Sequence, residues 1–292
     1  MTIFYNADRP LHYLERGRGE ALLLIHGLGS SGADWALQVR ALEGRFRVIV
    51  PDLPGCGHSR PLLGDCSIPK FAASLWALLD HLEIKQSNIL GFSLGGAVAL
   101  EMALQRPESV PRLALINSLS SYRLDTWRMW FEARLPSLLI YLFGMRLVGW
   151  LCAARMFPNP WQRALRERAA TVVSAASAEN YLNIIGALVR WTATDRLKRL
   201  RSRILMIAAE FDLTPMAQKR ALALELGAAM VVVKGSRHGT PFDAVEATNS
   251  SVFAMFTDQS LPPADRMVCD EPQPMQPLEF AGSLAEQHAL GP

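Results

Sequence analysis

The residue of this sequence best suited to nucleophilic chemistry is a serine between glycines, in the stretch "GFSLGG" at residues 91–96. The stretch follows an apolar, β-rich run and precedes a helix-like one, so Ser93 is expected on a tight strand-to-helix turn that needs small neighbours. Such a turn lifts the hydroxyl out of a sheet and places it at a helix N-terminus, where free N–H groups favour developing negative charge. The same motif also arises by chance in glycine-rich chains as an ordinary turn, so its partners decide its meaning.

A serine nucleophile needs a general base, and the sequence offers six histidines. His238, in "VKGSRHGTPFD", directly follows the last β-like run, at the edge of a parallel sheet where ligands bind. The other five precede the serine or lie in segments that are structural or exposed: His12, His26, His58, His81 and His288. His238 is therefore the predicted general base.

An acid that orients the histidine should lie between the serine and the histidine in the chain. The stretch "RILMIAAEFDLTP" offers Glu210 and Asp212 after a β-like run. Asp212 lies further into the loop, where its side chain can reach a histidine on the adjacent loop, and Glu210 is the alternative. The other strand end that could supply an acid reads "LINSLS", with Asn117 and no carboxylate. Asp212 is therefore the predicted orienting acid.

Acyl transfer also needs two backbone N–H groups that converge on the developing oxyanion. Leu94 follows the nucleophile and supplies one. The loop "LIHGLGSSGADW" supplies the other, with Leu28 as the donor between two glycines that allow close backbone folding. The residues predicted to contact substrate are Gly27, Trp35, Trp127 and Trp130.

Six short apolar runs must form the strands that carry these loops. They are nearly continuous in apolar residues, as strands buried on both faces of a parallel sheet are. The runs are ALLLIHG (21–27), FRVIVPD (46–52), NILGF (88–92), RLALIN (112–117), RILMIAAE (203–210) and AMVVVKG (229–235). Helical patterns at 68–84, 94–107 and 215–227 alternate with them, which predicts a doubly wound, mostly parallel α/β sheet.

One segment interrupts this alternation. Residues 119–200 are helical in pattern and hold five of the seven tryptophans, so we expect an inserted helical cap between two core segments, 1–118 and 201–257. Residues 119–203 carry 14 Lys/Arg against 5 Asp/Glu, a net charge of +9, whereas the rest of the chain is at −6. The Pro-rich, polar residues 258–292 are expected to form a disordered tail.

The overall composition narrows the class of function. A net charge of +3 argues against a nucleic-acid binder with one dominant basic face, and favours a small-molecule substrate. The four cysteines have no metal-ligand spacing, so they are expected to be reduced and no metal is expected. The N-terminal residues lack the pattern of a signal peptide, which predicts a cytoplasmic location. No feature of the sequence sets an oligomeric state.

Taken together, these motifs resemble the α/β-hydrolase superfamily, in its branch of small esterases, enol-lactonases and cofactor-free haloperoxidases. The resemblance rests on "HGLG" (26–29), "DLPGCGHS" (52–59), "GFSLGG" (91–96), "EFDLTP" (210–215) and the His238 loop. It implies the α/β-hydrolase fold, a Ser-His-Asp triad, an acyl-enzyme and no cofactor. Haloalkane dehalogenases and epoxide hydrolases have a similar pattern but an aspartate at this position, so Ser93 argues against those two activities. Arg237 departs from the glycine that often precedes the histidine, and we expect its side chain to point to solvent.

The function that these residues predict is hydrolysis of a carboxylic ester or lactone with an apolar acyl part through Ser93. Three alternatives are a C–C bond hydrolase, an acyltransferase and a ligand receptor that lacks catalysis. The cap is expected to set substrate choice by lining an apolar pocket. A second interpretation of its long apolar stretch, 135–157, is peripheral contact with membranes or lipid, because Arg146 and two glycines argue against a membrane span.

Overall fold

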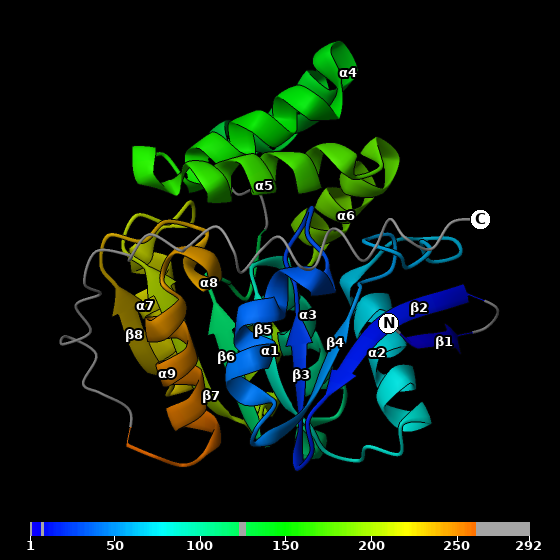
Figure 1. Ribbon diagram of the computed structural model, residues 1–292, viewed down its shortest axis with the longest axis vertical. Helices are drawn as coiled ribbons and strands as arrows, with labels where there is room; N and C mark the ends of the chain where they lie inside the picture. The colour runs from blue at the N-terminus through cyan, green and yellow to red at the C-terminus, as the bar shows by residue number, and fades with distance from the viewer. Residues whose placement is uncertain (1, 7–8, 123–126, 261–292) are drawn as a thin grey trace.

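The computed structural model describes residues 2–6, 9–122 and 127–260 of the chain. Its centre is one eight-stranded sheet in the order β1-β2-β4-β3-β5-β6-β7-β8 (Figure 1). β1 pairs antiparallel with β2, and β2 with β4, whereas the other neighbours are parallel. The strands are β1 (Thr2–Asn6), β2 (Arg9–Arg16), β3 (Glu20–Ile25), β4 (Phe46–Pro51), β5 (Asn88–Phe92), β6 (Arg112–Ile116), β7 (Arg203–Ala209) and β8 (Ala229–Val233).

The helices divide between the two faces of the sheet and a separate layer above it (Figure 1). Those of the core are α1 (Ala36–Leu42), α2 (Ile68–His81), α3 (Leu94–Gln105), α7 (Met216–Leu226), α8 (Thr240–Asp243) and α9 (Val245–Phe256). Those between β6 and β7 are α4 (Trp127–Met156), α5 (Arg163–Ala175) and α6 (Ala178–Arg190), with short 3-10 turns at Pro160–Gln162 and Thr194–Arg199. The prediction of a doubly wound, mostly parallel sheet is confirmed, and the N-terminal antiparallel hairpin extends it.

Strand periodicity explains the two hydrophobic cores. Successive side chains of a strand point to opposite faces, so Leu23 and Ile25 of β3 pack with the core under α2 and α3, whereas Leu22 and Leu24 pack with the core under α1 and α9. All four of these side chains are fully buried. Because β3 is apolar on both faces, it can only be an interior strand.

The cap, which we define as α4, α5 and α6 with the two 3-10 turns, lies above the carboxyl ends of the parallel strands (Figure 1). A buried carboxylate on α3 anchors the segment through which the chain returns from the cap to the sheet. Glu101 accepts hydrogen bonds from Trp191 Nε1 at 2.8 Å and from both terminal nitrogens of Arg196, at 2.9 and 2.8 Å. This anchor holds the cap on the helix that begins directly after Ser93. Of the predicted tail, 258–292, residues 258–260 are described, and Asp258 there pairs with Arg112 and Arg203; residues from 261 onward lie outside the described part of the chain.

Candidate active site

Ser93 sits on a strained turn between β5 and α3. Its backbone has φ 53° and ψ −116°, a region that non-glycine residues rarely adopt. The turn closes so tightly that a Cβ on Gly91 would lie 2.4 Å from the carbonyl oxygen of Gly95, and one on Gly95 would lie 2.1 Å from the carbonyl oxygen of Ile25. Only glycine fits at those two positions, so the glycines of the motif are a packing requirement of the strained turn. Strain of this kind is characteristic of functional sites.

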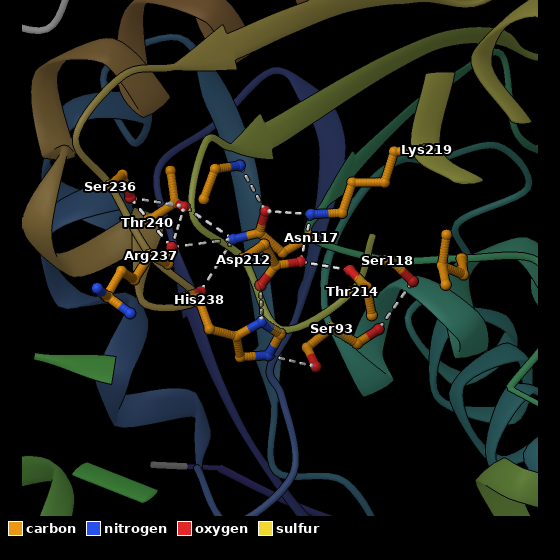
Figure 2. A network of polar contacts seen from close by, with 12 residues as sticks. Ser93, Asn117, Ser118, Asp212, Thr214, Lys219, Ser236, Arg237, His238 and Thr240 are labelled. Atoms are coloured by element: carbon orange, nitrogen blue, oxygen red, sulfur yellow. Dashed lines mark hydrogen bonds and ion pairs between the residues drawn. The ribbon is translucent and has the colours of Figure 1, made fainter. Parts of the chain in front are cut away.

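Three predicted residues from distant loops meet at this turn (Figure 2). His238 Nε2 lies 2.9 Å from Ser93 Oγ, and His238 Nδ1 lies 2.5 Å from Asp212 Oδ1. The Asp212 side chain is 1% exposed and that of His238 is 14% exposed. The carboxylate accepts a hydrogen bond from Nδ1–H, which leaves Nε2 with a lone pair directed at the serine hydroxyl. The arrangement can remove the Ser93 proton while the oxygen attacks an electrophile.

A buried lysine lies behind Asp212. Lys219 of α7 has no exposed surface, and its Nζ contacts Asp212 Oδ2. Thr214 Oγ1 donates to the same carboxylate oxygen. Burial alone would raise the pKa of Asp212, but the hydrogen bond and charge of His238, with the ammonium of Lys219, outweigh it and hold this pKa well below its usual range. Asp212 is therefore an anion under all ordinary assay conditions.

Asn117, at the end of β6, holds the histidine loop in place. Its Nδ2 donates to the carbonyl of His238 at 3.0 Å and to Thr240 Oγ1 at 2.8 Å. Its Oδ1 accepts from the backbone N–H of Ala209 at 2.8 Å and from Lys219 Nζ at 3.3 Å. Asn117 is thus the hydrogen-bonding centre that links the loop of the histidine to the lysine behind the acid (Figure 2).

The two predicted oxyanion donors lie on segments that meet at the serine. Leu94 is the first residue of α3, and the first N–H groups of a helix have no acceptor within it. Leu28 lies in the loop after β3. Two hydrogen bonds of the His26 ring hold this loop in place. His26 Nε2 accepts the N–H of Leu53 at 2.9 Å, so its Nδ1 carries the proton that is donated to the Gly27 carbonyl at 2.8 Å. Burial lowers the pKa of His26, consistent with a neutral, structural imidazole.

The cap packs on both loops that flank the serine. A Cβ on Gly29, beside the predicted donor Leu28, would lie 3.2 Å from the side chains of both Val173 and Tyr181. Leu28 itself packs against the cluster that those two cap residues form. On the other side, the loop of His238 meets Phe157, which lies 2.5 Å from a Cβ built on Gly239. The cap residues that contact these two loops are thus aliphatic and aromatic.

The structure separates the four predicted substrate contacts. Gly27 lies at the site, with Phe92 at 3.1 Å from a Cβ built on it. Trp35 is 2% exposed and packs in the core cluster that includes α1 and α9, so it is a packing residue and forms no part of the surface of the site. Trp127 and Trp130 begin α4, and their side chains lie outside the described part of the structure.

The structure also shows the surroundings of Glu210, the alternative acid, and of Arg237, the residue before the histidine. Glu210 accepts the N–H of Gly235 at 2.9 Å and is exposed, so it makes a turn contact while Asp212 makes the contact to the histidine. The guanidinium of Arg237 lies 5.9 Å from the centre of the Phe211 ring and points away from the imidazole (Figure 2). Its role is a surface cation–π contact.

Asp243 joins the cap to the histidine loop and gives a testable dependence of stability on pH. It accepts hydrogen bonds from Ser236 Oγ at 2.8 Å and from Gln162 of the cap at 3.3 Å. Burial raises the pKa of Asp243 to about 6, against the hydrogen bonds that lower it. Because its pKa is higher in the folded state, its stabilising contribution is complete below the unfolded pKa and is lost as the pH rises through about 6.

We therefore expect Asp243→Asn to gain stability over the wild type as the pH rises. The difference in the free energy of unfolding should change in favour of the variant by about 2 kcal/mol between about pH 4 and about pH 7.5. Urea unfolding of both proteins across this range measures the difference. A difference that stays constant with pH would contradict this account of Asp243.

The described residues contain no group of three or more His, Cys, Asp or Glu side chains that could hold a metal ion.

The sequence analysis did not identify Lys219, and it set Asn117 aside because Asn117 is not a carboxylate. The "LINSLS" strand end was a signal for Asn117, since it lies where such folds place a site residue.

Comparisons with known proteins identify relatives of this chain. The family model described as the alpha/beta hydrolase fold matches residues 20–244. A putative carbamate hydrolase from Pseudomonas syringae is 35% identical over 229 residues, which are 76% of this chain and 87% of that protein. The magnesium-chelatase 30 kDa subunit of Rhodobacter capsulatus is 45% identical over 101 residues, which are 34% of this chain and 35% of that protein.

Solved structures show the same fold. The enol-lactonase from Burkholderia xenovorans LB400 superposes with a TM-score of 0.79 at 24% identity, over 88% of this chain and all of that one. A bromoperoxidase from Bacillus anthracis has a TM-score of 0.79 at 20% identity, over 86% of this chain and 96% of that one. The family model and the hydrolase that aligns with 76% of the chain settle the assignment. The protein is a member of the alpha/beta hydrolase family.

Proposed function

We propose that this hydrolase cleaves a carboxylic ester or lactone with an apolar acyl part, through an acyl-enzyme on Ser93. The observation that carries the proposal is the continuous hydrogen-bonded line from Ser93 Oγ through His238 to Asp212, on a strained turn. Such a line provides the general base that makes a hydroxyl a nucleophile at neutral pH.

In the proposed cycle, His238 takes the Ser93 proton as Oγ attacks the substrate carbonyl. The N–H groups of Leu28 and Leu94 hold the negative oxygen of the tetrahedral intermediate. His238 then gives its proton to the leaving alkoxide, which departs and leaves the acyl-enzyme. A water molecule, deprotonated by His238, attacks the acyl carbonyl, and the proton returns to Ser93 as the carboxylic acid is released. Asp212 fixes the histidine tautomer and stabilises the imidazolium in both halves.

The apolar acyl part is inferred from the cap. Val173 and Tyr181 pack beside the oxyanion loop, and Phe157 packs beside the histidine loop. We expect an acyl chain that enters between the cap and these loops to meet apolar groups and few polar ones. We expect kcat/KM on p-nitrophenyl esters to rise from acetate to a longer acyl chain by about 10-fold, as one or two buried methylenes add binding energy.

Hydrolysis of the p-nitrophenyl series from acetyl to long-chain acyl tests the proposal. A longer-chain optimum supports an apolar acyl pocket, whereas a maximum at acetate would contradict it. Absence of turnover on every ester and lactone would contradict ester hydrolysis itself and would favour C–C bond hydrolysis by the same residues.

A carbamate is the second candidate substrate, because a putative carbamate hydrolase is 35% identical over most of this chain. The same nucleophile and oxyanion donors can act on a carbamate carbonyl, so the site residues do not separate the two classes. A p-nitrophenyl carbamate in the same assay does. A kcat/KM for the carbamate above that of every ester would make it the preferred substrate class.

A further inference from the structure

The outermost helix of the cap leaves a broad apolar surface exposed. We define the outer face of α4 by its exposed large apolar residues: Leu135, Leu138, Tyr141, Leu142, Phe143, Trp150 and Leu151. Tyr141 is 86% exposed and Phe143 is 61% exposed. α4 is the element furthest from the sheet (Figure 1). Single exposed apolar residues are ordinary, but seven of them gathered on the two helical segments that meet at Gly144 indicate a binding surface.

Apolar residues of α4 lie both on its outward side and on the side that packs in the cap. Leu135, Leu138 and Leu142 follow the three- and four-residue spacing of one helix face. The opposite side is also apolar, but it is buried, because Ile140 and Val148 pack in the cap cluster with residues of α5 and α6. Within the described residues, α4 thus has one apolar face that the cap covers and one that faces outward.

Two arginines border the outward apolar residues. Arg146 precedes Trp150 by four residues, and Arg155 follows Leu151 by four, so each lies beside its neighbour on the helix surface. Both arginines are exposed. Apolar and aromatic residues flanked by arginine are the composition of helices that lie in the headgroup region of anionic bilayers. A subunit interface of this chain would instead bring the positively charged caps of two copies together.

The geometry of α4 favours a helix that lies on a membrane over one that crosses it. Among the described residues one helix segment, Ser137–Met156, is by itself long and apolar enough to span, and 28% of its apolar window is buried inside the protein. The bent pair Pro160–Ala175 and Ala178–Arg190 meets the same criteria only when taken as one span. The backbone breaks at Gly144, with φ 74° and ψ 178°, and charged Arg146 lies two residues further on. A span would also have to abandon its packing on α5 and α6. The outer face alone can enter the interface without disturbing the fold.

We propose that the outer face of α4, with Arg146 and Arg155, docks this protein on an anionic lipid bilayer, with the helix lying in the headgroup region. Because the cap that carries α4 also packs on the loops around Ser93, docking places the candidate site close to acyl compounds dissolved in the bilayer. The docking itself rests only on the surface residues and is independent of the chemistry proposed for Ser93.

Flotation of the full chain with phosphatidylcholine vesicles, with and without phosphatidylglycerol, tests the proposal. We expect binding to the anionic vesicles that weakens at high salt. Arg146→Gln/Arg155→Gln should lower the partition coefficient by about 10-fold, since each basic residue at such a surface contributes a few-fold. Leu138→Ser/Leu142→Ser should lower it by about 10-fold or more, since two leucines lose their insertion.

A matched control pair lies on α7, where exposed Arg220 and Leu224 are also four residues apart. Arg220→Gln/Leu224→Ser should float like the wild type. The melting temperatures of all variants should agree with that of the wild type, because every changed side chain is exposed. Hydrolysis of a water-soluble ester, where it occurs, should be unaffected, and flotation gives its result even if no ester is hydrolysed.

Four results would overturn the proposal. They are wild-type protein that remains unbound with anionic vesicles, binding that neither α4 pair weakens, binding that resists alkaline carbonate as a spanning helix would, and a dimer in light scattering that Leu138→Ser/Leu142→Ser abolishes without any vesicle binding. The last result would assign the outer face of α4 to a second copy of this chain.

Discussion

Ser93→Ala is expected to lower kcat for hydrolysis of the best p-nitrophenyl ester by about 10⁶-fold, the loss found when the nucleophile of such a triad is removed. The change takes away the attacking oxygen and leaves the rest of the site in place. The Ser93 N–H still donates to the Ile116 carbonyl at 2.9 Å, and its carbonyl still accepts from Ser118 Oγ at 2.9 Å. Steady-state kinetics of wild type and variant, prepared in parallel, measure the loss.

The control for this prediction is folding. Alanine adopts the strained backbone at position 93 no more easily than serine, so the melting temperature should be close to that of the wild type. A variant that keeps more than about 1% of wild-type kcat would contradict a Ser93 acyl-enzyme, since the remaining oxyanion donors and binding groups do not supply a covalent route.

Asp212→Asn is expected to lower kcat by about 10⁴-fold. A neutral amide in place of the carboxylate stabilises the imidazolium poorly. Because Thr214 and Lys219 are donors on the other oxygen, the amide NH2 group faces Nδ1, donates to it and favours the tautomer that is wrong for proton removal from Ser93. KM should change little, because Asp212 is buried behind the histidine and does not reach the substrate. Steady-state kinetics that separate kcat from KM check both parts.

Asp212→Asn should also be less stable than the wild type. A triad without a buried lysine behind its acid would not predict this loss. Asp212→Asn leaves the ammonium of Lys219, with no exposed surface, without its carboxylate partner. Removal of one member of a buried ion pair commonly costs about 3–5 kcal/mol. Lys219→Met in the same chain should recover most of this stability in urea unfolding while kcat stays low. A double variant no more stable than Asp212→Asn would contradict the pairing of Lys219 with Asp212.

Much of the site could be predicted from the sequence because Ser93, Asp212 and His238 each lie in a short local motif. The turn at Ser93 needs glycine at specific places for steric reasons, so the requirement is visible as "GFSLGG". Asp212 and His238 each follow an apolar strand run, and parallel strands bring their carboxyl ends to one edge. Strand, turn and chain order were sufficient to bring the three residues together.

Other residues of the site gave no such local signal. Lys219 lies on α7 among Gln218 and Arg220, where a lysine is ordinarily solvated, and only the packing of α7 against the loop of Asp212 buries its amine. Trp35 was predicted to contact substrate, but its ring packs in the core cluster with residues of α1 and α9. The side-chain direction at this position depends on the packing of α1 against the sheet, which no local motif gives.

Reaction with a fluorophosphonate, followed by intact-mass and peptide mass spectrometry, tests the central claim most directly. The reagent phosphonylates only a serine whose proton a neighbouring base removes, and the fluoride that leaves is not retained. We predict one adduct per chain, located on the peptide that contains Ser93 and absent in both Ser93→Ala and His238→Ala. An unmodified wild-type chain, or an adduct that persists in Ser93→Ala, would contradict the assignment of Ser93 as an activated nucleophile.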